Sequence, residues 1–272
     1  MTLSAREVSA HFERAGASPS RALGQNFVID PNTVRRIARL ADVGPDSHVV
    51  EIGAGLGSLT RALAETGATI TAVEIDRHLI DQLRCNTSEC PAVNVVHADA
   101  MTLDWSALLG TNPGRWTLVA NLPYNLATPL VADLLDQVPE IGRMLVMVQK
   151  EVGERFAAVP RTAAYGAVSV KIAYWAEAAV VGIVPPSVFL PRPKIDSALV
   201  RIDRRPAPAV GCDRERMFAL VRAGFAQRRK MLRGTLRDLV PDKAWAIAGV
   251  RPEQRAEELD VFAWGRLTDA AT

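Results

Sequence analysis

Short apolar runs alternate with amphipathic stretches along most of the chain. The first 45 residues are polar and irregular and contain one segment with helical periodicity, at 31–40. β-branched apolar runs then predict strands at 48–52, 69–75, 92–98, 116–120 and 143–149. Helical periodicity fills the intervals at 58–65, 77–85 and 128–138, and Gly67 is a candidate helix C-cap. Crossovers of this length predict a parallel sheet with helices on both of its faces.

The second half of the chain changes character near residue 205. A charged helical segment covers 150–159, the periodicity of 163–175 is ambiguous, and strands are predicted at 180–184 and 197–202 around a Pro-rich loop. Beyond residue 208 the pattern is helical throughout, at 214–227, 231–240, 243–250 and 260–269. We therefore expect an α/β domain over 1–205 and a small all-α domain over 206–272.

Composition narrows the class of protein. The chain has 272 residues, of which 49% are apolar and 23% charged, and this excludes a disordered or collagen-like chain. No apolar run is long enough for a transmembrane helix, and the charged N-terminus lacks the apolar core of a secretory signal. Cys85, Cys90 and Cys212 have no zinc-ligand spacing, so we expect no metal site and reduced thiols in a cytoplasmic protein.

Charge is distributed unevenly. The net charge is +2, but residues 201–272 hold 15 basic and 10 acidic side chains, which leaves the first 200 residues net acidic. Basic residues gather between 220 and 240, where Asp238 is the one acid. This asymmetry indicates a polyanionic partner such as nucleic acid. A solvated charged helix face in an Arg-rich protein is the alternative.

The segment Glu51-Ile-Gly-Ala-Gly-Leu-Gly57 follows a predicted strand and opens a helix. Glycines at this position let the backbone approach a ligand, and the helix N-terminus favours an electron-rich group. A dinucleotide fingerprint would need a third glycine where Ser58 stands. The glutamate and the glycine spacing favour S-adenosylmethionine (SAM), although a tight turn alone would also account for the glycines.

Two further acids end the next two strands. Glu74, 21 residues after Gly53, is placed to accept the ribose hydroxyls of an adenosine-containing cofactor. Asp99 follows the third strand and could accept the exocyclic amine of the adenine. Each has a simpler alternative, since Glu74 could be a surface carboxylate and Asp99 a turn or capping residue. Their shared place at the carboxyl ends of successive strands favours a ligand.

The most specific segment is Asn121-Leu122-Pro123-Tyr124, at the end of the fourth strand. The proline stiffens the turn. The Asn121 amide oxygen and the Leu122 carbonyl offer two acceptors for the two N–H groups of an exocyclic amine. Such a pair would keep the nitrogen lone pair available for attack on a methyl sulfonium. Tyr124 can stack on the base, an interaction worth about 1–3 kcal/mol. A proline turn beside a buried aromatic is the alternative.

Together these segments resemble the class I SAM-dependent methyltransferases, and among them the rRNA adenine N6-dimethyltransferases. The resemblance runs from about residue 23 to 201 and includes Leu23-Gly-Gln-Asn-Phe27, Gln149-Lys-Glu-Val152 and Phe189-Leu-Pro-Arg-Pro-Lys-Ile-Asp-Ser197. It implies a Rossmann-like methyltransferase sheet. The second position of the Asn-Leu-Pro-Tyr motif is Leu122, where DNA adenine methyltransferases have proline, and this departure favours an RNA substrate.

The resemblance also implies roles for individual residues. The cofactor would contact the main-chain or side-chain groups of Asn26, Val28, Gly53, Gly55, Glu74, Ile75, Asp99, Ala100 and Asn121. Asn121, Leu122, Pro123 and Tyr124 would form the catalytic segment, and Tyr124 and Phe189 would enclose a flipped adenine. Many relatives have leucine where this chain has Val28.

The implied reaction is direct methyl transfer without a nucleophilic intermediate. The substrate would be two adjacent adenosines in the 3′-terminal hairpin of 16S rRNA, within an assembling 30S subunit, and we expect a monomer. The spacing of Arg222, Arg229, Arg233 and Arg237 predicts several cations along a helical surface. Contacts with rRNA phosphates would come from Arg222, Arg228, Arg229, Lys230 and Arg233.

Three other functions share part of this pattern. An Erm-type enzyme would methylate 23S rRNA, but Asn125 and the 189–197 segment favour the 16S branch. An assembly factor would bind the small subunit with methylation as a secondary role. A nicotinamide dehydrogenase is disfavoured by Ser58, by the Asn-Leu-Pro-Tyr segment and by the scattered histidines.

Overall fold

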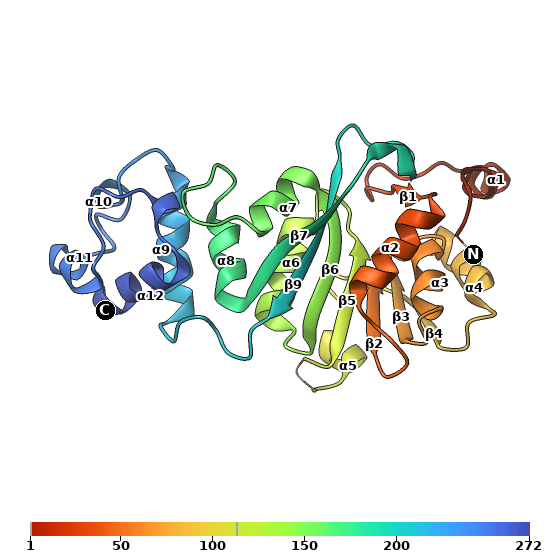
Figure 1. The fold of residues 1–272 in the computed structure, drawn as a ribbon, viewed down its shortest axis with the longest axis horizontal. Coiled ribbons are helices and arrows are strands. Elements are labelled where there is room, and N and C mark those ends of the chain that lie inside the picture. Colours follow the sequence, from red (N-terminus) through yellow and green to blue (C-terminus); the bar gives the residue numbers. More distant parts are fainter. Residues whose placement is uncertain (1, 113) are drawn as a thin grey trace. The chain divides into compact units, whose positions relative to one another are not determined.

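A seven-stranded sheet forms the centre of the computed structural model, which describes residues 2–112 and 114–272 (Figure 1). The strands follow the order β4-β3-β2-β5-β6-β9-β7. The first five pair in parallel, and β9 runs antiparallel to β6. Their bounds are β2 His48–Ile52, β3 Thr69–Glu74, β4 Val93–His97, β5 Trp116–Asn121, β6 Ile141–Gln149, β7 Ala176–Val184 and β9 Ser197–Arg204. The predicted strands are confirmed, although β7 begins earlier than expected.

The strand order reverses direction next to β2. The chain runs outward from β2 through β3 to β4, then returns to place β5 and β6 on the other side of β2. In open parallel sheets, the crevice beside such a reversal, at the carboxyl ends of the strands, is where ligands bind. Gly53, Glu74 and Asn121 lie at or directly after the ends of β2, β3 and β5.

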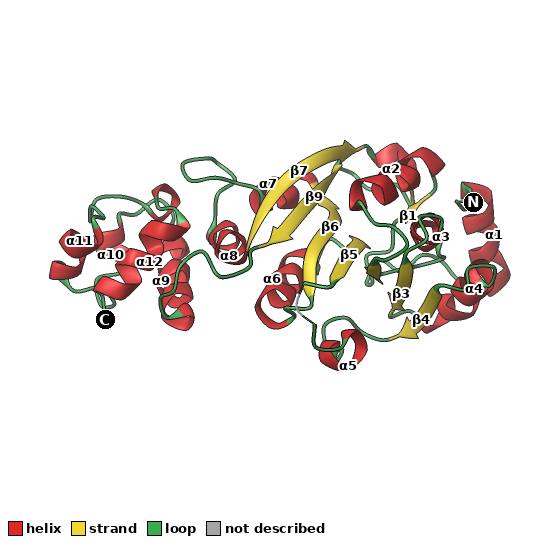
Figure 2. Cartoon of the chain, turned by 60° about the horizontal axis from the view of Figure 1, so that its bottom comes forward, coloured by secondary structure: helices red, strands yellow, loops and turns green. Residues whose placement is uncertain are grey.

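Helices cover both faces of the sheet, as expected. On one face α2 (Pro31–Ala41) and α3 (Ser58–Ala64) bury an apolar cluster with Val49, Ile70 and Val119, and α4 (Arg77–Thr87) packs near the β4 edge. Across the sheet α6 (Ala127–Gln137) packs against β6 (Figure 2). Within residues 2–112 and 114–272, no helix is long and apolar enough to cross a membrane.

Some elements were not anticipated from the sequence. The N-terminal helix α1 (Ala5–Ala15) begins at a capping box in which the Ser4 hydroxyl accepts from Glu7 N and the Glu7 carboxylate accepts from Ser4 N. The short helix α5 (Trp105–Leu109) is capped by Asp104. Residues Phe27–Val28 (β1) pair antiparallel with Phe189–Leu190 (β8). The latter segment lies inside the predicted Pro-rich loop, and a two-residue strand has no periodicity to reveal it.

The chain divides into two compact units. The first comprises the described residues up to Gly153 together with Ala179–Asp203, and the second comprises Glu154–Ala178 and Arg204–Thr272. The chain passes from the first unit to the second near residue 204, close to the boundary expected at 205. Residues 154–178, which we expected in the first domain, belong to the second unit. The physical reason is side-chain packing, because Tyr165, Val170 and Tyr174 are buried in the core of the second unit.

The second unit is built around aromatic side chains. Trp264 on α12 (Val261–Ala270) is fully buried among residues of α8 (Ala167–Trp175), α9 (Arg214–Ala226) and α11 (Asp242–Ala248). The Tyr165 hydroxyl donates to Leu259 O at 2.9 Å. The helix predicted at 231–240 is wrong in extent, since α10 covers only Leu232–Thr235. At its N-terminus, Leu232 N and Arg233 N donate to Gln254 O and Pro252 O, and after Thr235 the chain continues in turns.

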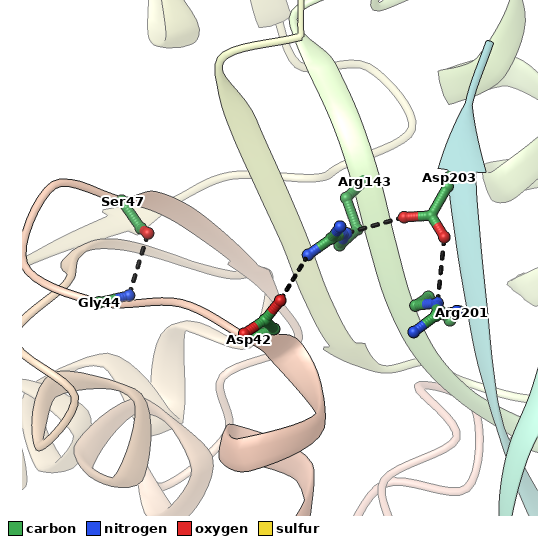
Figure 3. A network of polar contacts seen from close by, with 6 residues as sticks. All are labelled: Asp42, Gly44, Ser47, Arg143, Arg201 and Asp203. Carbon is green, nitrogen blue, oxygen red and sulfur yellow. Dashed lines mark hydrogen bonds and ion pairs between the residues drawn. The ribbon is translucent and has the colours of Figure 1, made fainter.

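An exposed network of ion pairs lies near the amino ends of strands β2 and β6 (Figure 3). Arg143 on β6 donates to Asp203 on β9 at 2.8 Å and lies 3.4 Å from Asp42 at the end of α2, while Arg201 pairs with Asp203 at 3.0 Å. Nearby, Gly44 N donates to Ser47 Oγ before β2. Because these side chains are well exposed, each pair contributes about 0–1 kcal/mol. The network lies near the amino ends of β2 and β6, away from the candidate ligand crevice.

Glycine 224 tests the packing of the second unit. A Cβ added at Gly224 on α9 would lie 2.7 Å from Cη2 of the buried Trp264, whereas one added at Gly234 on α10 would meet nothing within 4 Å. We expect Gly224→Ala to lower the free energy of unfolding by about 1–3 kcal/mol through overpacking. The control Gly234→Ala should leave it unchanged or raise it by up to about 1 kcal/mol. Denaturant titration followed by tryptophan fluorescence measures both, and equal effects would contradict the packing described.

Candidate active site

A cleft opens at the strand reversal. Its cavity volume is about 100 Å³, and the cleft is open to solvent on one side. Its walls come from the segment before α2, the turn after β2, the ends of β3 and β5, and residues on α2, α3 and α4. Of the predicted site residues, the cleft is lined by Asn26, Val28, Gly53, Gly55, Glu74, Ile75, Asn121 and Pro123.

The glycine-rich turn forms the floor of the cleft. Gly53 and Gly55 have φ values of 73° and 59°, in the left-handed region that side chains with a Cβ rarely adopt. A Cβ at Gly53 would meet only Asn121 O, at 3.7 Å, whereas at Gly55 it would lie 3.0 Å from the Phe27 ring. Gly53 N and Ala54 N donate to Val73 O, which fixes the turn against β3. The turn therefore presents bare backbone to a ligand.

Glu74 is held rigidly at the end of β3. Its carboxylate accepts from Gly55 N at 2.7 Å and from Asp76 N at 2.9 Å, and the side chain is buried. Burial raises its pKa, although these backbone donors act in the opposite direction. A carboxylate has about four acceptor positions, so two backbone donors leave capacity for ribose hydroxyls. The exposed side chain of Ile75 follows it at the rim of the cleft.

Asn121 connects the end of β5 with the N-terminal segment. Its Nδ2 donates to Asn26 O at 2.8 Å, which leaves the amide oxygen as an acceptor. Beside it, Gly24 (φ 63°) approaches so closely that a Cβ would lie 3.0 Å from Pro123 Cβ. Leu122 is buried, and its N donates to Met147 O. The carbonyl groups of this turn are thus positioned from both sides.

Tyr124 is half-buried, and its hydroxyl lies 3.0 Å from the fully buried Ser197 Oγ. Burial raises the pKa of Tyr124, and this hydrogen bond lowers it in part. The contact anchors the tip of the tyrosine ring to the start of β9. Ser197 ends the 189–197 segment, and no periodicity in the sequence signals that it meets Tyr124.

Five of the predicted catalytic and cofactor-binding residues do not line the cleft, namely Leu122 and Tyr124, which lie on the turn beside it, and Phe189, Asp99 and Ala100. Phe189 is 2% exposed and packs in the cluster beneath α2 and α3, so its ring is not displayed beside Tyr124. Asp99 does not line the cleft, and its carboxylate accepts from Met101 N at 2.9 Å, as a turn residue does. Ala100 lines a separate depression near Trp105.

The cleft is acidic. Glu51 and Glu74 both line it, and none of the described lining residues is basic. Glu51 is 1% exposed, and its Oε2 has no hydrogen-bond partner among the described residues. Burial, opposed in part by the Thr60 hydroxyl and reinforced by Glu74, raises the pKa of Glu51 to about 8. Such a lining suits a cationic ligand. The sequence motif contains Glu51, but its position alone does not reveal that its carboxyl lacks a partner.

Comparison with known proteins identifies the family. Residues 17–271 match the family described as ribosomal RNA adenine dimethylase. The chain belongs to this family. It is 45% identical over 274 residues to ribosomal RNA small subunit methyltransferase A of Bifidobacterium longum, covering 94% of this chain and 89% of the relative. The relative of the same name from Thermobifida fusca is 47% identical over 264 residues, covering 93% and 91%.

Solved structures show the same fold. The 23S rRNA methyltransferase ErmE is 29% identical with a TM-score of 0.67, covering 90% of this chain and 98% of that one. A dimethyladenosine transferase from Plasmodium falciparum has a TM-score of 0.72 at 22% identity, covering 88% and 94%. The predicted class I methyltransferase fold and the resemblance to rRNA adenine dimethyltransferases are therefore confirmed.

As a member of the dimethylase family, the enzyme uses SAM, and its cleft fits that cofactor. Glu51 Oε2, which has no hydrogen-bond partner among the described residues, can become a negative partner for a ligand whose methionine end carries a net positive charge. Glu74 has acceptor capacity for a ribose, and the bare backbone at Gly53 leaves room beside the β2 turn. A pyrophosphate-bearing dinucleotide would be disfavoured next to the two buried carboxyl groups.

Alanine substitution at Gly53, compared with a control glycine, distinguishes an effect on backbone strain from an effect on ligand binding. Gly53→Ala and the control Gly249→Ala both place a Cβ at a positive φ, 73° and 65°, without a close contact. We expect each to cost about 1 kcal/mol of stability. Only Gly53→Ala should weaken SAM binding, by roughly tenfold or more, since its methyl group enters the cleft. Thermal denaturation and calorimetric titration with SAM test this, and unchanged SAM affinity in Gly53→Ala would show that the turn does not touch the cofactor.

Proposed function

We propose that this enzyme transfers two methyl groups to each of two adjacent adenosines in the 3′-terminal hairpin of 16S rRNA. The main support is the pair of acceptors at Asn121 and Leu122 beside an acidic cleft, in a chain 45–47% identical to relatives named for the ribosomal small subunit. ErmE, named for 23S rRNA, is 29% identical. The identities favour a small-subunit substrate over the Erm-type alternative.

The residues at the end of β5 orient the target amine. Asn121 is held by its bond to Asn26 O, so its amide oxygen and the Leu122 carbonyl can accept the two N6 protons. Accepting hydrogen bonds from both N–H groups directs the nitrogen lone pair toward the methyl group and stabilises the positive charge that develops on nitrogen. SAM supplies that methyl group as an electrophilic sulfonium. Catalysis then depends on alignment, and the protein provides no nucleophile.

The target base has to leave its stack to reach the cleft. In the proposal it stacks on Tyr124, whose ring is anchored by the hydroxyl contact with Ser197. Phe189 takes the other face of the base only if the β1–β8 pair shifts, because its ring is buried and its backbone pairs with Val28. In the same proposal Asp99, aided by Ala100, contacts the adenine end of SAM after the 99–101 turn rearranges.

The second unit supplies the proposed grip on rRNA phosphates. Arg222 lies on α9, while Arg229 and Lys230 follow that helix in a turn, and all three are exposed. Arg228 pairs with Glu257 at 2.6 Å, and Arg233 lies 3.7 Å from Glu253. The sequence predicted that these cations share one helical surface. They do not, because α9 ends before Arg228. They still form one short exposed basic segment.

The proposed setting follows from the substrate. An enzyme that modifies small-subunit rRNA would meet its target in assembling 30S particles in the cytoplasm, and we propose that it acts there as a monomer. The absence of a membrane-spanning helix among the described residues is compatible with this setting.

Asn121 variants separate methyl transfer from subunit binding. Asn121→Ala removes an acceptor for the amine, so we expect a rate lower by about 10²–10³-fold. Asn121→Asp keeps an acceptor and should retain more activity, although it loses the donor to Asn26 O. Transfer from methyl-labelled SAM to unmodified small and large subunits measures both, with subunit binding followed in parallel. Full activity in Asn121→Ala, or equal labelling of large subunits, would contradict the proposal. Retained binding without transfer would separate a subunit-binding role from catalysis.

Salt dependence tests the basic segment. Arg229→Glu combined with Lys230→Glu should weaken binding to small subunits at least tenfold and reduce the slope of log affinity against log salt by about 2. The control, Lys243→Glu with Arg251→Glu, makes the same charge change in the same unit outside this segment. Equal losses for both pairs would indicate a general charge effect and remove the assigned role.

A further inference from the structure

A buried carboxyl oxygen without a partner is unusual in a folded protein. Glu51 is 1% exposed, and its Oε2 has no hydrogen-bond partner among the described residues. The Thr60 hydroxyl, on the adjacent helix α3, is also buried, and it lowers the pKa of the Glu51 carboxyl only in part. Leaving a buried carboxyl oxygen unsatisfied is costly, and more so when the group is charged. Glu51 lines the cleft, so a bound ligand can supply the partner that the protein does not.

The charges around Glu51 are all of one sign. Of the described residues that line the cleft, only Glu51 and Glu74 titrate, and Asp76 lies directly behind Glu74. On β5, the residue in register with Glu51 is the apolar Val119. From α3 the nearest polar group is the neutral Thr60 hydroxyl. In this setting the ionised form of Glu51 is disfavoured until a positive charge enters the cleft.

We propose that Glu51 is the residue with which the cleft distinguishes SAM from S-adenosylhomocysteine (SAH), the product left after methyl transfer. The methionine end of SAM carries a carboxylate, an ammonium and a sulfonium, and is therefore a net cation. In SAH the sulfonium has become a neutral thioether, so the same end has no net charge. Glu51 ionises and releases a proton when SAM binds, and it recovers a proton when only SAH is left. Recovery of the proton weakens the hold on the product and assists its exchange for fresh SAM, which each target adenosine requires between its two methylations.

The direction of the pH effect follows from linkage. The pKa of Glu51 in the ligand-free protein is raised to about 8 by burial, from 4.5 in an exposed chain. The folded protein therefore holds the proton more tightly than the unfolded chain, and this group lowers the stability of the ligand-free protein as pH rises from about 4.5 to about 8. Below a pH of about 8, SAM has to displace that proton. Its affinity should thus rise about tenfold per pH unit and level off near the pKa.

Proton release on the wild-type enzyme is the primary test. Calorimetric titrations with SAM near pH 7, in two buffers of different ionisation enthalpy, give the number of protons released per ligand. We expect close to one proton for SAM, close to none for SAH, and close to one for sinefungin, which carries an ammonium in place of the sulfonium. No release with SAM, or equal release with SAM and SAH, would overturn the proposal.

Two variants locate the titrating group. Glu51→Gln should abolish proton release and make SAM affinity nearly independent of pH between about pH 6 and about pH 8, while the ammonium group of the ligand titrates as in the wild type. Thr60→Val removes the hydroxyl that lowers the pKa of Glu51, so the pH at which SAM affinity levels off should move upward. This second variant keeps the test decisive if Glu51→Gln folds poorly. An unchanged pH profile in both variants would assign the proton to another group. These experiments need no RNA, so their outcome is independent of the proposed substrate.

Discussion

The hydrogen bond from Asn121 Nδ2 to Asn26 O is the contact on which the active site depends most. It joins the end of β5 to a segment 95 residues earlier in the chain, and it fixes which end of the Asn121 amide faces the substrate. The same N-terminal segment pairs with Phe189–Leu190 through β1 and β8, and Gly24 lets it approach Pro123 closely. One strap therefore crosses the cofactor side, the catalytic turn and the substrate side of the cleft.

Electrostatics give the cleft its preference for a cofactor. Two buried carboxyl groups without a basic residue in the described lining make a site that is costly to leave without a ligand and well suited to a cation. Glu74 has its donors supplied by the backbone, whereas Glu51 lacks one for Oε2. In this account the two acids have different partners. Glu74 accepts hydrogen bonds from neutral hydroxyl groups of the cofactor, and Glu51 interacts with its positively charged end. In the second unit the reverse sign prevails, with exposed cations after α9 and an aromatic core around Trp264 that holds them in place.

The sequence predicted the sheet and most of the cleft, because β-branched runs and glycine-rich turns are local signals. Gly53, Glu74 and Asn121 line one cleft because the carboxyl ends of parallel strands meet at one edge. Local patterns failed where long-range contacts decide the outcome. Residues 154–178 join the second unit through Tyr165 and Tyr174, and the helix expected at 231–240 gives way to turns after Thr235. The burial of Phe189 depends on its pairing with Val28, which no periodicity encodes.

The central claim is that the β5 turn presents the N6 amine of an rRNA adenosine to SAM twice. The most direct measurement is nucleoside analysis of small-subunit rRNA from a strain that lacks this modification, after incubation with the enzyme and methyl-labelled SAM. The account predicts labelled N6,N6-dimethyladenosine confined to the 3′-terminal hairpin. Label in another nucleoside, or none in that hairpin from an enzyme shown to bind SAM, would contradict it.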